Sequence, residues 1–460
     1  MSQAIEGTIK PNSNLTKRTN YRWVVMALLF SVWTVACADR ANMGIALPYM
    51  KKEFGITNTE AGAIISLFST AYAIVQIPIG LFYKNVSNTV RSIMFPVFLA
   101  ITSLFTFLMG TTSSPLLLKF YRFGLGIGEG PLGIGCTDII NRWFPAQEKG
   151  TAMGIWIAAS KFGPALVPIV GAIIIQMYGW REVFLVCAIP GIVLAIAWPF
   201  LVKNSPRDSK FCSPAEVEYI ENCDAAPINA DGTNAGAGKK YNLAWLDRLI
   251  RTQPVKPLET VKQVFLSWNL MGAAFGHLVV NGIANTFTSW IPLYLISVKG
   301  FTTIKMGFLA SAPFVGAVLG NLLCGLISDR ILEKRRKPMM MLGFIGIIFT
   351  LYALVYAPNN PFYLGAMLLV NGIFMGLSYP AFGVYAMGLA KKETFPLCYG
   401  VINTGGQLGN VITPIVVGYL LDHYSWDSVF MYLSFTGILA IVAIATTVEP
   451  ANDASCEIKR

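Results

Sequence analysis

Twelve apolar runs, each of about 20 residues or more, constrain what this chain can fold into. A helix needs roughly 20 apolar residues to cross the hydrocarbon core of a bilayer, so each run has the length of one membrane span. Only 13% of the 460 residues are charged and 54% are hydrophobic, a balance that water-soluble domains do not show. The sequence therefore predicts an all-α polytopic membrane protein. The spans are expected at 23–47, 60–82, 92–112, 115–139, 151–175, 182–202, 265–295, 305–328, 338–357, 361–389, 398–421 and 427–447.

A polar central stretch divides these runs into two sets of six. The loops between the runs carry an unequal share of basic residues. By the positive-inside rule, the loops holding Arg142, Lys149 and the 330–337 run lie in the cytoplasm, which also places both termini there. The expected organisation is a cytoplasmic tail at 1–21, a bundle at 22–202, a cytoplasmic linker at 203–264, a second bundle at 265–447 and a cytoplasmic tail at 448–460.

The two sets of runs repeat each other. At offsets of 244 to 246 residues, glycine, proline, serine and aromatic residues of the first half coincide with the same types in the second. Parallel repeats of this kind are typical of carriers whose halves rock around a site at the middle of the membrane. The matching pairs are Gly62/Gly307, Ser66/Ser311, Gly80/Gly325, Gly154/Gly400, Gly163/Gly409, Pro168/Pro414, Trp180/Trp426, Phe184/Phe430 and Pro48/Pro292.

Several short motifs extend over nearly the whole chain outside the linker and the termini. They include Ala38-Asp39-Arg40-Ala41-Asn42, Tyr72-Ala-Ile-Val-Gln76-Ile-Pro-Ile-Gly80, Arg122-Phe-Gly-Leu-Gly-Ile-Gly-Glu129, Arg142-Trp-Phe-Pro and Gly400-Val-Ile-Asn403. By these motifs the chain resembles the major facilitator superfamily. Within it, the chain is similar to the anion:cation symporter family of bacterial D-galactonate, hexuronate and aldarate permeases, with sialin-like carriers more distant. The resemblance implies the major facilitator fold, in which twelve transmembrane helices form two pseudo-symmetric six-helix bundles.

The family's loop motif, which is associated with gating, is present in the second half as Gly325-Leu-Ile-Ser-Asp329-Arg330. The first-half copy begins at Gly80 and departs from the family pattern, because Lys84 replaces the usual aspartate and Asn85 the usual arginine. The resemblance therefore implies a gating role for Gly325, Asp329 and Arg330 only.

Charged residues inside the apolar runs are candidate functional residues, because each costs about 2.5–3.5 kcal/mol or more near the centre of a membrane helix. Asp39 and Arg40 are neighbours in the first run and point about 100° apart, which favours separate roles: a proton site for Asp39 and an anion site for Arg40. Arg122 and Glu129 are seven residues apart and share one helix face. We expect Asp39, Glu129 and Arg122 to couple protons. Static ion pairs that brace the helices are the alternative.

Uncharged polar residues mark other candidate contacts. His277, Asn281 and Asn285, with Ser289 beyond them, are spaced at i, i+4 and form one polar stripe, suited to substrate binding or to hydrogen bonding between helices. Tyr72, Gln76 and Asn403 resemble pocket residues of the family, whereas a histidine at 277 departs from the galactonate-type permeases. Weaker candidates are Ser378 and Tyr379 in the tenth run and Lys161 in the fifth; if Lys161 lines the cavity, three cations favour a dianionic substrate.

We therefore expect a proton-coupled symporter that takes up a small organic anion, most consistent with a sugar acid, by alternating access in the bacterial inner membrane. An exchanger of dicarboxylates or phosphate esters and a transporter-like sensor are the alternatives. The chain has no HExxH motif, no phosphate-binding loop and no nucleophile elbow, so no enzyme is expected. The scattered cysteines and two histidines predict no metal site. We expect protons as the only coupling ion and no cofactor, the lipid bilayer and the substrate as partners, no nucleic acid, and a monomer.

Overall fold

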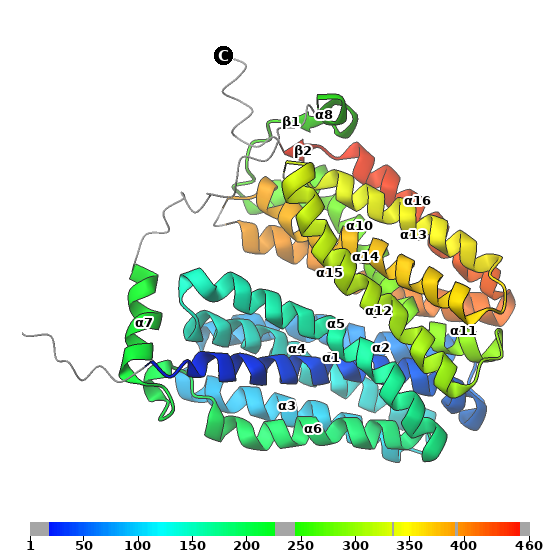
Figure 1. Ribbon diagram of the computed structural model, residues 1–460, viewed down its shortest axis with the longest axis horizontal. Coiled ribbons are helices and arrows are strands. Elements are labelled where there is room, and N and C mark those ends of the chain that lie inside the picture. The colour runs from blue at the N-terminus through cyan, green and yellow to red at the C-terminus, as the bar shows by residue number, and fades with distance from the viewer. Residues whose placement is uncertain (1–17, 226–243, 334, 392–393, 451–460) are drawn as a thin grey trace, which may run out of the picture.

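The computed structural model describes residues 18–225, 244–333, 335–391 and 394–450, and most of these residues are helical. Figure 1 shows two bundles side by side, the N-terminal one in blue to green below and the C-terminal one in yellow-green to red above. The N-terminal bundle consists of α1 (Tyr21–Phe54), α2 (Asn58–Asn85), α3 (Asn88–Thr111), α4 (Pro115–Trp143), α5 (Ala146–Met177) and α6 (Trp180–Leu201).

The C-terminal bundle repeats this arrangement, so the protein has the predicted twelve-span, two-bundle fold. Its seventh span is broken, because Pro292 has no backbone N–H to continue the helix through Trp290. The elements are α10 (Trp268–Ser289) with α11 (Ile291–Ser297), α12 (Thr303–Leu326) with the π-helical η2 (Ile327–Ile331), α13 (Lys337–Val355), α14 (Pro361–Leu389), α15 (Phe395–His423) and α16 (Trp426–Thr446).

Within the described residues, nine helices are long and apolar enough by length and composition to cross a membrane. The other three long helices of the bundles, α4, α10 and α15, pack among these nine. Polar side chains lower the hydropathy of these three helices: α4 carries Arg122 and Glu129, α10 carries His277 and three asparagines, and α15 carries Asn403, Gln407 and Asn410. Candidate functional residues thus lie both on these three helices and on apolar spans such as α1, which carries Asp39 and Arg40.

The central linker lies at one end of both bundles, which we call the linker end; the far end is where α1 stops and α2 begins. The described linker elements are η1 (Pro206–Asp208), α7 (Pro214–Ala225), α8 (Ala244–Ile250), β1 (Thr252–Gln253) and α9 (Val261–Leu266). Strand β1 pairs in parallel with β2 (Glu449–Pro450), a small pairing that the sequence analysis did not predict.

Each end of the linker is fixed to its own bundle. On the N-terminal side, buried Glu216 of α7 accepts hydrogen bonds from the backbone N–H of Tyr21 (2.8 Å) and from the Arg22 guanidinium (2.9 Å). On the C-terminal side, Asp247 of α8 forms an ion pair with Arg335 at 2.6 Å. The two contacts attach α7 and α8 to different bundles.

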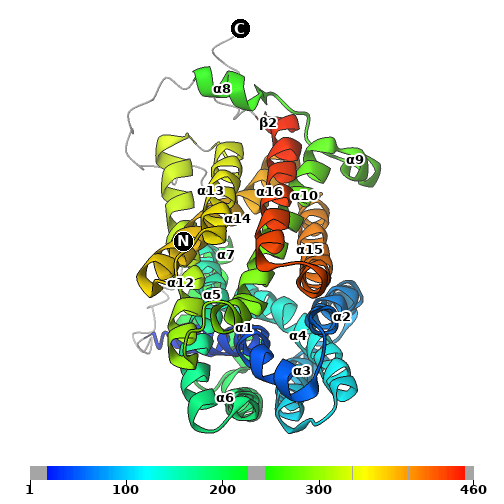
Figure 2. The same cartoon turned by 90° about the vertical axis from the view of Figure 1, so that its right-hand side faces the viewer.

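The bundles meet at the far end through two equivalent helix crossings. Helix α2 packs along α15 and α5 along α12, and Figure 2 shows both pairs side by side. A Cβ added to Gly62 would lie 2.2 Å from the backbone oxygen of Pro414, and one added to Gly307 would lie 2.3 Å from that of Pro168. Only glycine permits these approaches. Because Gly62 repeats as Gly307 and Pro168 as Pro414, the same contact is made twice.

Beside one of these contacts, a carboxylate of one bundle forms hydrogen bonds with the other bundle. Asp422, at the end of α15, accepts hydrogen bonds from the backbone N–H groups of Asn58 (2.8 Å) and Thr59 (2.7 Å), and from the Thr59 hydroxyl (2.6 Å). The first N–H groups of a helix have no partner within the helix, and the helix dipole favours an anion there. Asp422 of one bundle therefore caps α2 of the other.

At the linker end the same four helices are apart. A Cβ added to Gly154 of α5, Gly325 of α12 or Gly400 of α15 would meet nothing within 4 Å in the described part of the chain. Gly80 of α2 would meet only the tip of Ile134, at 3.9 Å. The bundles are thus closed at the far end and separated at the linker end.

Candidate functional site

The centre of the N-terminal bundle holds an ion pair between α1 and α4. Nε of Arg40 donates to Oε1 of Glu129 at 2.8 Å, and a second guanidinium nitrogen contacts the same oxygen. Glu129 is fully buried, whereas the Arg40 side chain is 32% exposed although it lies near the middle of a membrane helix. Oε2 of Glu129 has no hydrogen-bond partner among the described residues. Arg40 therefore connects a buried carboxylate to an accessible space.

Aromatic rings surround the Arg40 guanidinium. Its central carbon lies 5.2 Å from the ring centroid of Tyr72, 5.3 Å from that of Phe68 and 5.9 Å from that of Trp33. Gln76, one turn beyond Tyr72 on α2, donates to the Tyr72 hydroxyl at 3.4 Å. Cation–π contacts stabilise a charge without neutralising it, so the guanidinium can still bind an anion.

Asp39 and Arg122 lie deeper in the same bundle. Arg122 donates to the backbone oxygen of Asp39 at 3.2 Å and lies over the Phe68 ring, while Oδ1 of Asp39 accepts from Asn42 at 3.1 Å. Both residues are at most 2% exposed. Arg122 and Glu129 are within electrostatic range, but the direct partner of Glu129 is Arg40. The carboxyls of Asp39 and Glu129 therefore face protein, not lipid.

A small cavity lies where α5 of the N-terminal bundle faces α10, α12 and α14 of the C-terminal bundle; we call it the inter-bundle cavity. Lys161 of α5 enters it from the N-terminal bundle, and its ammonium lies 5.0 Å from the ring centroid of Tyr379 on α14. Lys161 is within electrostatic range of Arg40, and Tyr379 is within electrostatic range of Arg40 and Tyr72. The lining residues are Lys161, Val280, Ala284, Pro313, Phe314, Ala317, Asn321, Met375, Gly376 and Tyr379.

The polar stripe on α10 faces α15 over much of its length. His277 Nδ1 lies 3.0 Å from the backbone oxygen of Ile402, and Asn285 donates to that of Asn410 at 3.0 Å. Asn281 donates to the His277 backbone oxygen within α10, at 2.8 Å. Two members of the stripe thus form hydrogen bonds between helices, as the alternative interpretation expects. The His277 ring also lies 5.1 Å from that of Tyr379, at the margin of the inter-bundle cavity.

Two further candidates from the sequence occupy different positions. Ser378 is fully buried, donates to the Met375 backbone oxygen at 3.0 Å and packs against Gly343 of α13, so it faces the interior of its bundle and does not line the inter-bundle cavity. The next residue, Tyr379, lines it instead, because adjacent helical positions point about 100° apart. Asn403 is partly exposed on α15, next to the carbonyl of Ile402 that contacts His277.

The loop motifs lie at the linker end. In the second-half motif, Gly325 faces open space, Asp329 forms an ion pair with Arg336 at 2.8 Å, and Arg330 is exposed. The side chains of Lys84 and Asn85, the departures in the first-half copy, fall outside the described residues. No group of three or more metal-ligating side chains is present in the described ranges.

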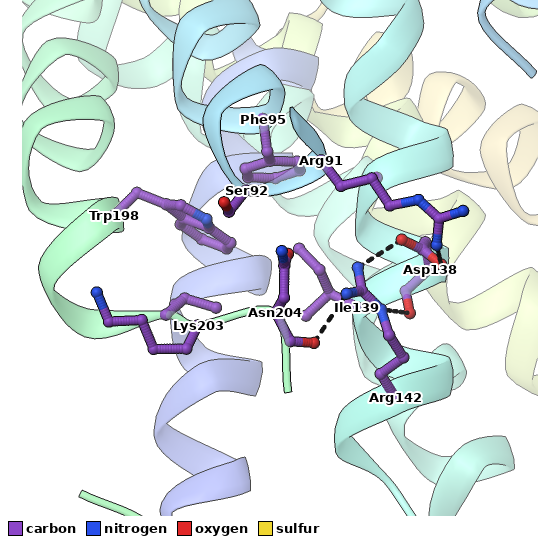
Figure 3. A pocket seen from close by; sticks show the side chains of 11 residues that line it. Arg91, Ser92, Phe95, Asp138, Ile139, Arg142, Trp198, Lys203 and Asn204 are labelled. Atoms are coloured by element: carbon purple, nitrogen blue, oxygen red, sulfur yellow. Dashed lines mark hydrogen bonds and ion pairs between the residues drawn. The ribbon is translucent and has the colours of Figure 1, made fainter. Parts of the chain in front are cut away.

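A small polar pocket at the linker end of the N-terminal bundle contains the last residue of the first-half copy, Arg91. Figure 3 shows Arg91 and Arg142 converging on Asp138, with Arg142 also donating to the backbone oxygen of Asn204 at 2.8 Å. The Phe95 and Trp198 rings pack beside them, 4.4 Å apart between centroids. The pocket ties α3, α4 and the end of α6 together, so we interpret it as bracing this bundle.

Three residues that the structure brings to the site or to its closure were not among the candidates expected from the sequence. Phe68 was hidden because an aromatic residue in an apolar span gives no distinctive signal. Asn321 could have been found, because it is an amide in the apolar run of α12. Asp422 lies at the end of a span, where an acidic residue is ordinary, so nothing in the sequence indicated that it caps a helix of the other bundle.

Comparison with known sequences places the chain in a family. The sequence profile of the Major Facilitator Superfamily matches residues 28–335 and 303–457. The chain is 30% identical over 446 residues to the probable galactarate/D-glucarate transporter GarP of Escherichia coli (strain K12), covering 93% of this chain and 94% of that protein. It is 28% identical over 440 residues to the D-galactonate transporter of Escherichia coli O6:H1, with 94% and 96% covered. It is 25% identical over 440 residues to the probable sulfoacetate transporter SauU of Cupriavidus necator, with 94% of each chain covered.

Solved structures share the fold. A bacterial homologue of the human lysosomal transporter Spinster, in an inward-facing and occupied conformation, aligns with a TM-score of 0.69 at 14% identity, covering 94% of this chain and 96% of that one. A D-xylose-proton symporter aligns with a TM-score of 0.69 at 15% identity, with 93% and 98% covered.

Proposed function

The chain belongs to the Major Facilitator Superfamily, and we propose that it takes up a small organic anion, most consistent with a sugar acid such as a hexonate, hexuronate or aldarate, together with protons. It is an integral multi-pass membrane transporter and not an enzyme. The protons are the coupling ion of the proposed cycle, and the two bundles provide alternating access to a site between them.

The observation that carries this proposal is the ion pair between Arg40 and Glu129. Bound to Glu129, Arg40 is neutralised; bound to a substrate carboxylate, it leaves Glu129 as a buried carboxylate without its partner. An unpaired buried carboxylate is costly in a low-dielectric interior, so Glu129 would then take up a proton. Substrate binding and protonation of Glu129 therefore favour each other, which is the thermodynamic requirement for symport.

The substrate class is supported by the cations of the site and by the relatives. Arg40 and Lys161 present positive charge to the accessible space, which favours an anion. Relatives named as galactarate/D-glucarate and D-galactonate transporters align with this chain over more than nine-tenths of its length. Polar hydrogen-bonding groups nearby, including Gln76 and Asn321, suit the hydroxyl groups of a sugar acid.

The structure corresponds to the inward-facing state if the linker end is cytoplasmic. The far-end exceptions to the positive-inside pattern are Lys51, Lys52, Arg181 and Lys299. Lys52 is exposed, but the other three are engaged locally: Lys51 donates to the side-chain oxygen of Asn58, Arg181 forms an ion pair with Glu53 at 2.6 Å, and Lys299 donates to the Ala357 backbone oxygen at 2.6 Å. The linker end keeps the basic run around Arg330 and Arg336, so we assign it to the cytoplasm, together with both termini.

Reconstituted proteoliposomes test the proposal. Acidifying the outside should stimulate uptake of a labelled sugar acid above its equilibrium level, and a protonophore should abolish this accumulation. Exchange of internal for external anion without any response to pH would indicate an exchanger. Binding without flux would indicate a sensor, and neither outcome is compatible with proton-coupled uptake.

A further inference from the structure

Among the cations that the structure describes within the membrane interior, Lys161 alone has no carboxylate partner. Arg40 pairs with Glu129, and Arg122 lies within electrostatic range of both Asp39 and Glu129. Lys161 has neither a hydrogen bond nor an ion pair with any described residue; its ammonium instead contacts the face of the Tyr379 ring. Lys161 is half-buried among membrane helices, and a cation–π contact offsets only part of the cost of holding an ammonium group there.

A second unsatisfied polar group lines the same cavity. Oδ1 of Asn321, on α12, is buried without a hydrogen-bond partner in the described chain. The other lining positions are mostly apolar or glycine, and they come from α10, α12 and α14. Buried polar groups without partners are rare in native proteins, and one that lines a cavity is available to a group that enters there.

The positions of Lys161 and Arg40 follow from one helix crossing. A Cβ added to Gly163 of α5 would lie 2.4 Å from the backbone oxygen of Thr34 and 2.9 Å from the backbone nitrogen of Ala38, so the two helices touch there. From this contact Lys161 is displaced toward the linker end and Arg40 toward the far end. At 1.5 Å per residue their backbones are offset by about 9 Å along the helix axes, so the two cations come from different depths of the membrane.

We propose that Lys161, with Asn321 and Tyr379, forms a second anion subsite that binds the distal carboxylate of a dianionic sugar acid while Arg40 binds the other. The inference rests on the proposed function and narrows its substrate class. It favours aldarates, which carry a carboxylate at each end, over aldonates, which carry only one. A monoanion can neutralise only one of the two cations, so the second would remain without a counter-charge.

The test compares two acids of the same carbon number, galactarate and D-galactonate, on purified full-length protein. Binding of each is measured calorimetrically, and the quantity of interest is the ratio of their affinities. We expect the unmodified protein to prefer galactarate, and Lys161→Gln to reduce the ratio by about tenfold or more. Lys161→Arg keeps the charge and should retain most of the preference.

Lys305→Gln is the matched control, because Lys305 is an exposed lysine of α12 at the far end and its loss changes the net charge equally. It should leave the ratio unchanged. Equal affinities in the unmodified protein, or an unchanged ratio in Lys161→Gln, would overturn the subsite while leaving sugar-acid uptake in place. If neither acid nor any other sugar acid bound, the proposed function itself would be overturned.

Discussion

The guanidinium of Arg40 on α1 reaches across to the carboxylate of Glu129 on α4, with Nε 2.8 Å from Oε1. The arginine is partly exposed and the glutamate is fully buried. Anything that competes for the arginine thus changes the electrostatic environment of a carboxyl group that water does not reach. The proposed coupling between substrate and proton depends on this asymmetry.

Replacing Glu129 by glutamine should uncouple transport. Glutamine keeps the shape and can still accept a hydrogen bond from Arg40, but it cannot carry a proton. We expect uptake driven by an acid exterior to be lost, while exchange of labelled for unlabelled substrate continues. Both are measured in proteoliposomes. Glu259→Gln, in the exposed linker, is the control and should behave as the unmodified protein. Persisting accumulation in Glu129→Gln would remove this residue from coupling.

Replacing Arg40 by alanine should abolish substrate binding. The planar guanidinium can bind a carboxylate through two hydrogen bonds, and losing one partner of a hydrogen-bonded charge pair typically costs about 2–5 kcal/mol. Affinity should therefore fall by at least about thirtyfold, and Arg40→Lys should recover only part of it because an ammonium lacks the bidentate geometry. Calorimetric titration gives both values. An unchanged affinity in Arg40→Ala would place the anion site elsewhere.

Replacing Gly62 by leucine should open the far end. Its Cβ would collide with the Pro414 backbone oxygen, which a flexible side chain cannot relieve. Spin labels on the exposed residues Leu116 and Phe362 report the separation of the bundles there by double electron–electron resonance. We expect the distance distribution to shift to longer values. Gly154→Leu, at the open linker end, should not widen it, since nothing lies within 4 Å. A shift in both variants alike would argue against the crossing as the cause.

Replacing Asp422 by alanine should weaken the same closure without a steric clash. A helix cap contributes about 0.5–2 kcal/mol, and here its loss affects only the state in which the bundles touch. The same spin-label pair should show a larger far-end-open fraction than in the unmodified protein. Asp427→Ala removes a carboxylate from the first turn of α16 within one bundle, and it should leave the distribution unchanged. If the two variants behave identically, Asp422 does not act between the bundles.

The attachment of α7 should depend on pH. Burial alone would raise the pKa of Glu216, but hydrogen bonds from the Thr19 hydroxyl and from the backbone N–H groups of Tyr21 and Arg22 bring that pKa below its ordinary value. A depressed pKa stabilises the folded state above the unfolded-state pKa of about 4.3, and this stabilisation is lost as the pH falls through the folded-state pKa. Thermal unfolding in detergent should show a loss of stability on acidification that is smaller in Glu216→Gln. Equal pH profiles would contradict this role.

The fold could be predicted from the sequence because hydrocarbon imposes one rule on every span. Apolar runs of sufficient length are nearly enough to predict the helices of both bundles. In the seventh run, Pro292 is the one interruption that the sequence shows. The repeat of Gly62 as Gly307 and of Pro168 as Pro414 indicated related halves. It could not indicate that the glycine of one half meets the proline of the other, because a repeat gives equivalence and not contact.

The site was less predictable because spacing along one helix says nothing about the helix opposite. The seven-residue spacing of Arg122 and Glu129 placed both on one face of α4, but Arg40 from α1 is the direct partner of Glu129. The i, i+4 stripe from His277 to Asn285 was visible in the sequence, whereas the α15 carbonyls that face it were not. Ser378 and Tyr379 are adjacent in the sequence, and only the packing of α14 determines that Tyr379, and not Ser378, lines the inter-bundle cavity.

The far-end crossings also bear on how such a chain could have arisen. Each half contains both the glycine and the proline of the contact, so each carries a surface that is complementary to a second copy of itself, as in a two-fold homodimer. A single six-helix chain that paired with its own duplicate would have formed both contacts at once. Fusion of the two copies into one polypeptide would then have joined halves whose far-end contacts already matched.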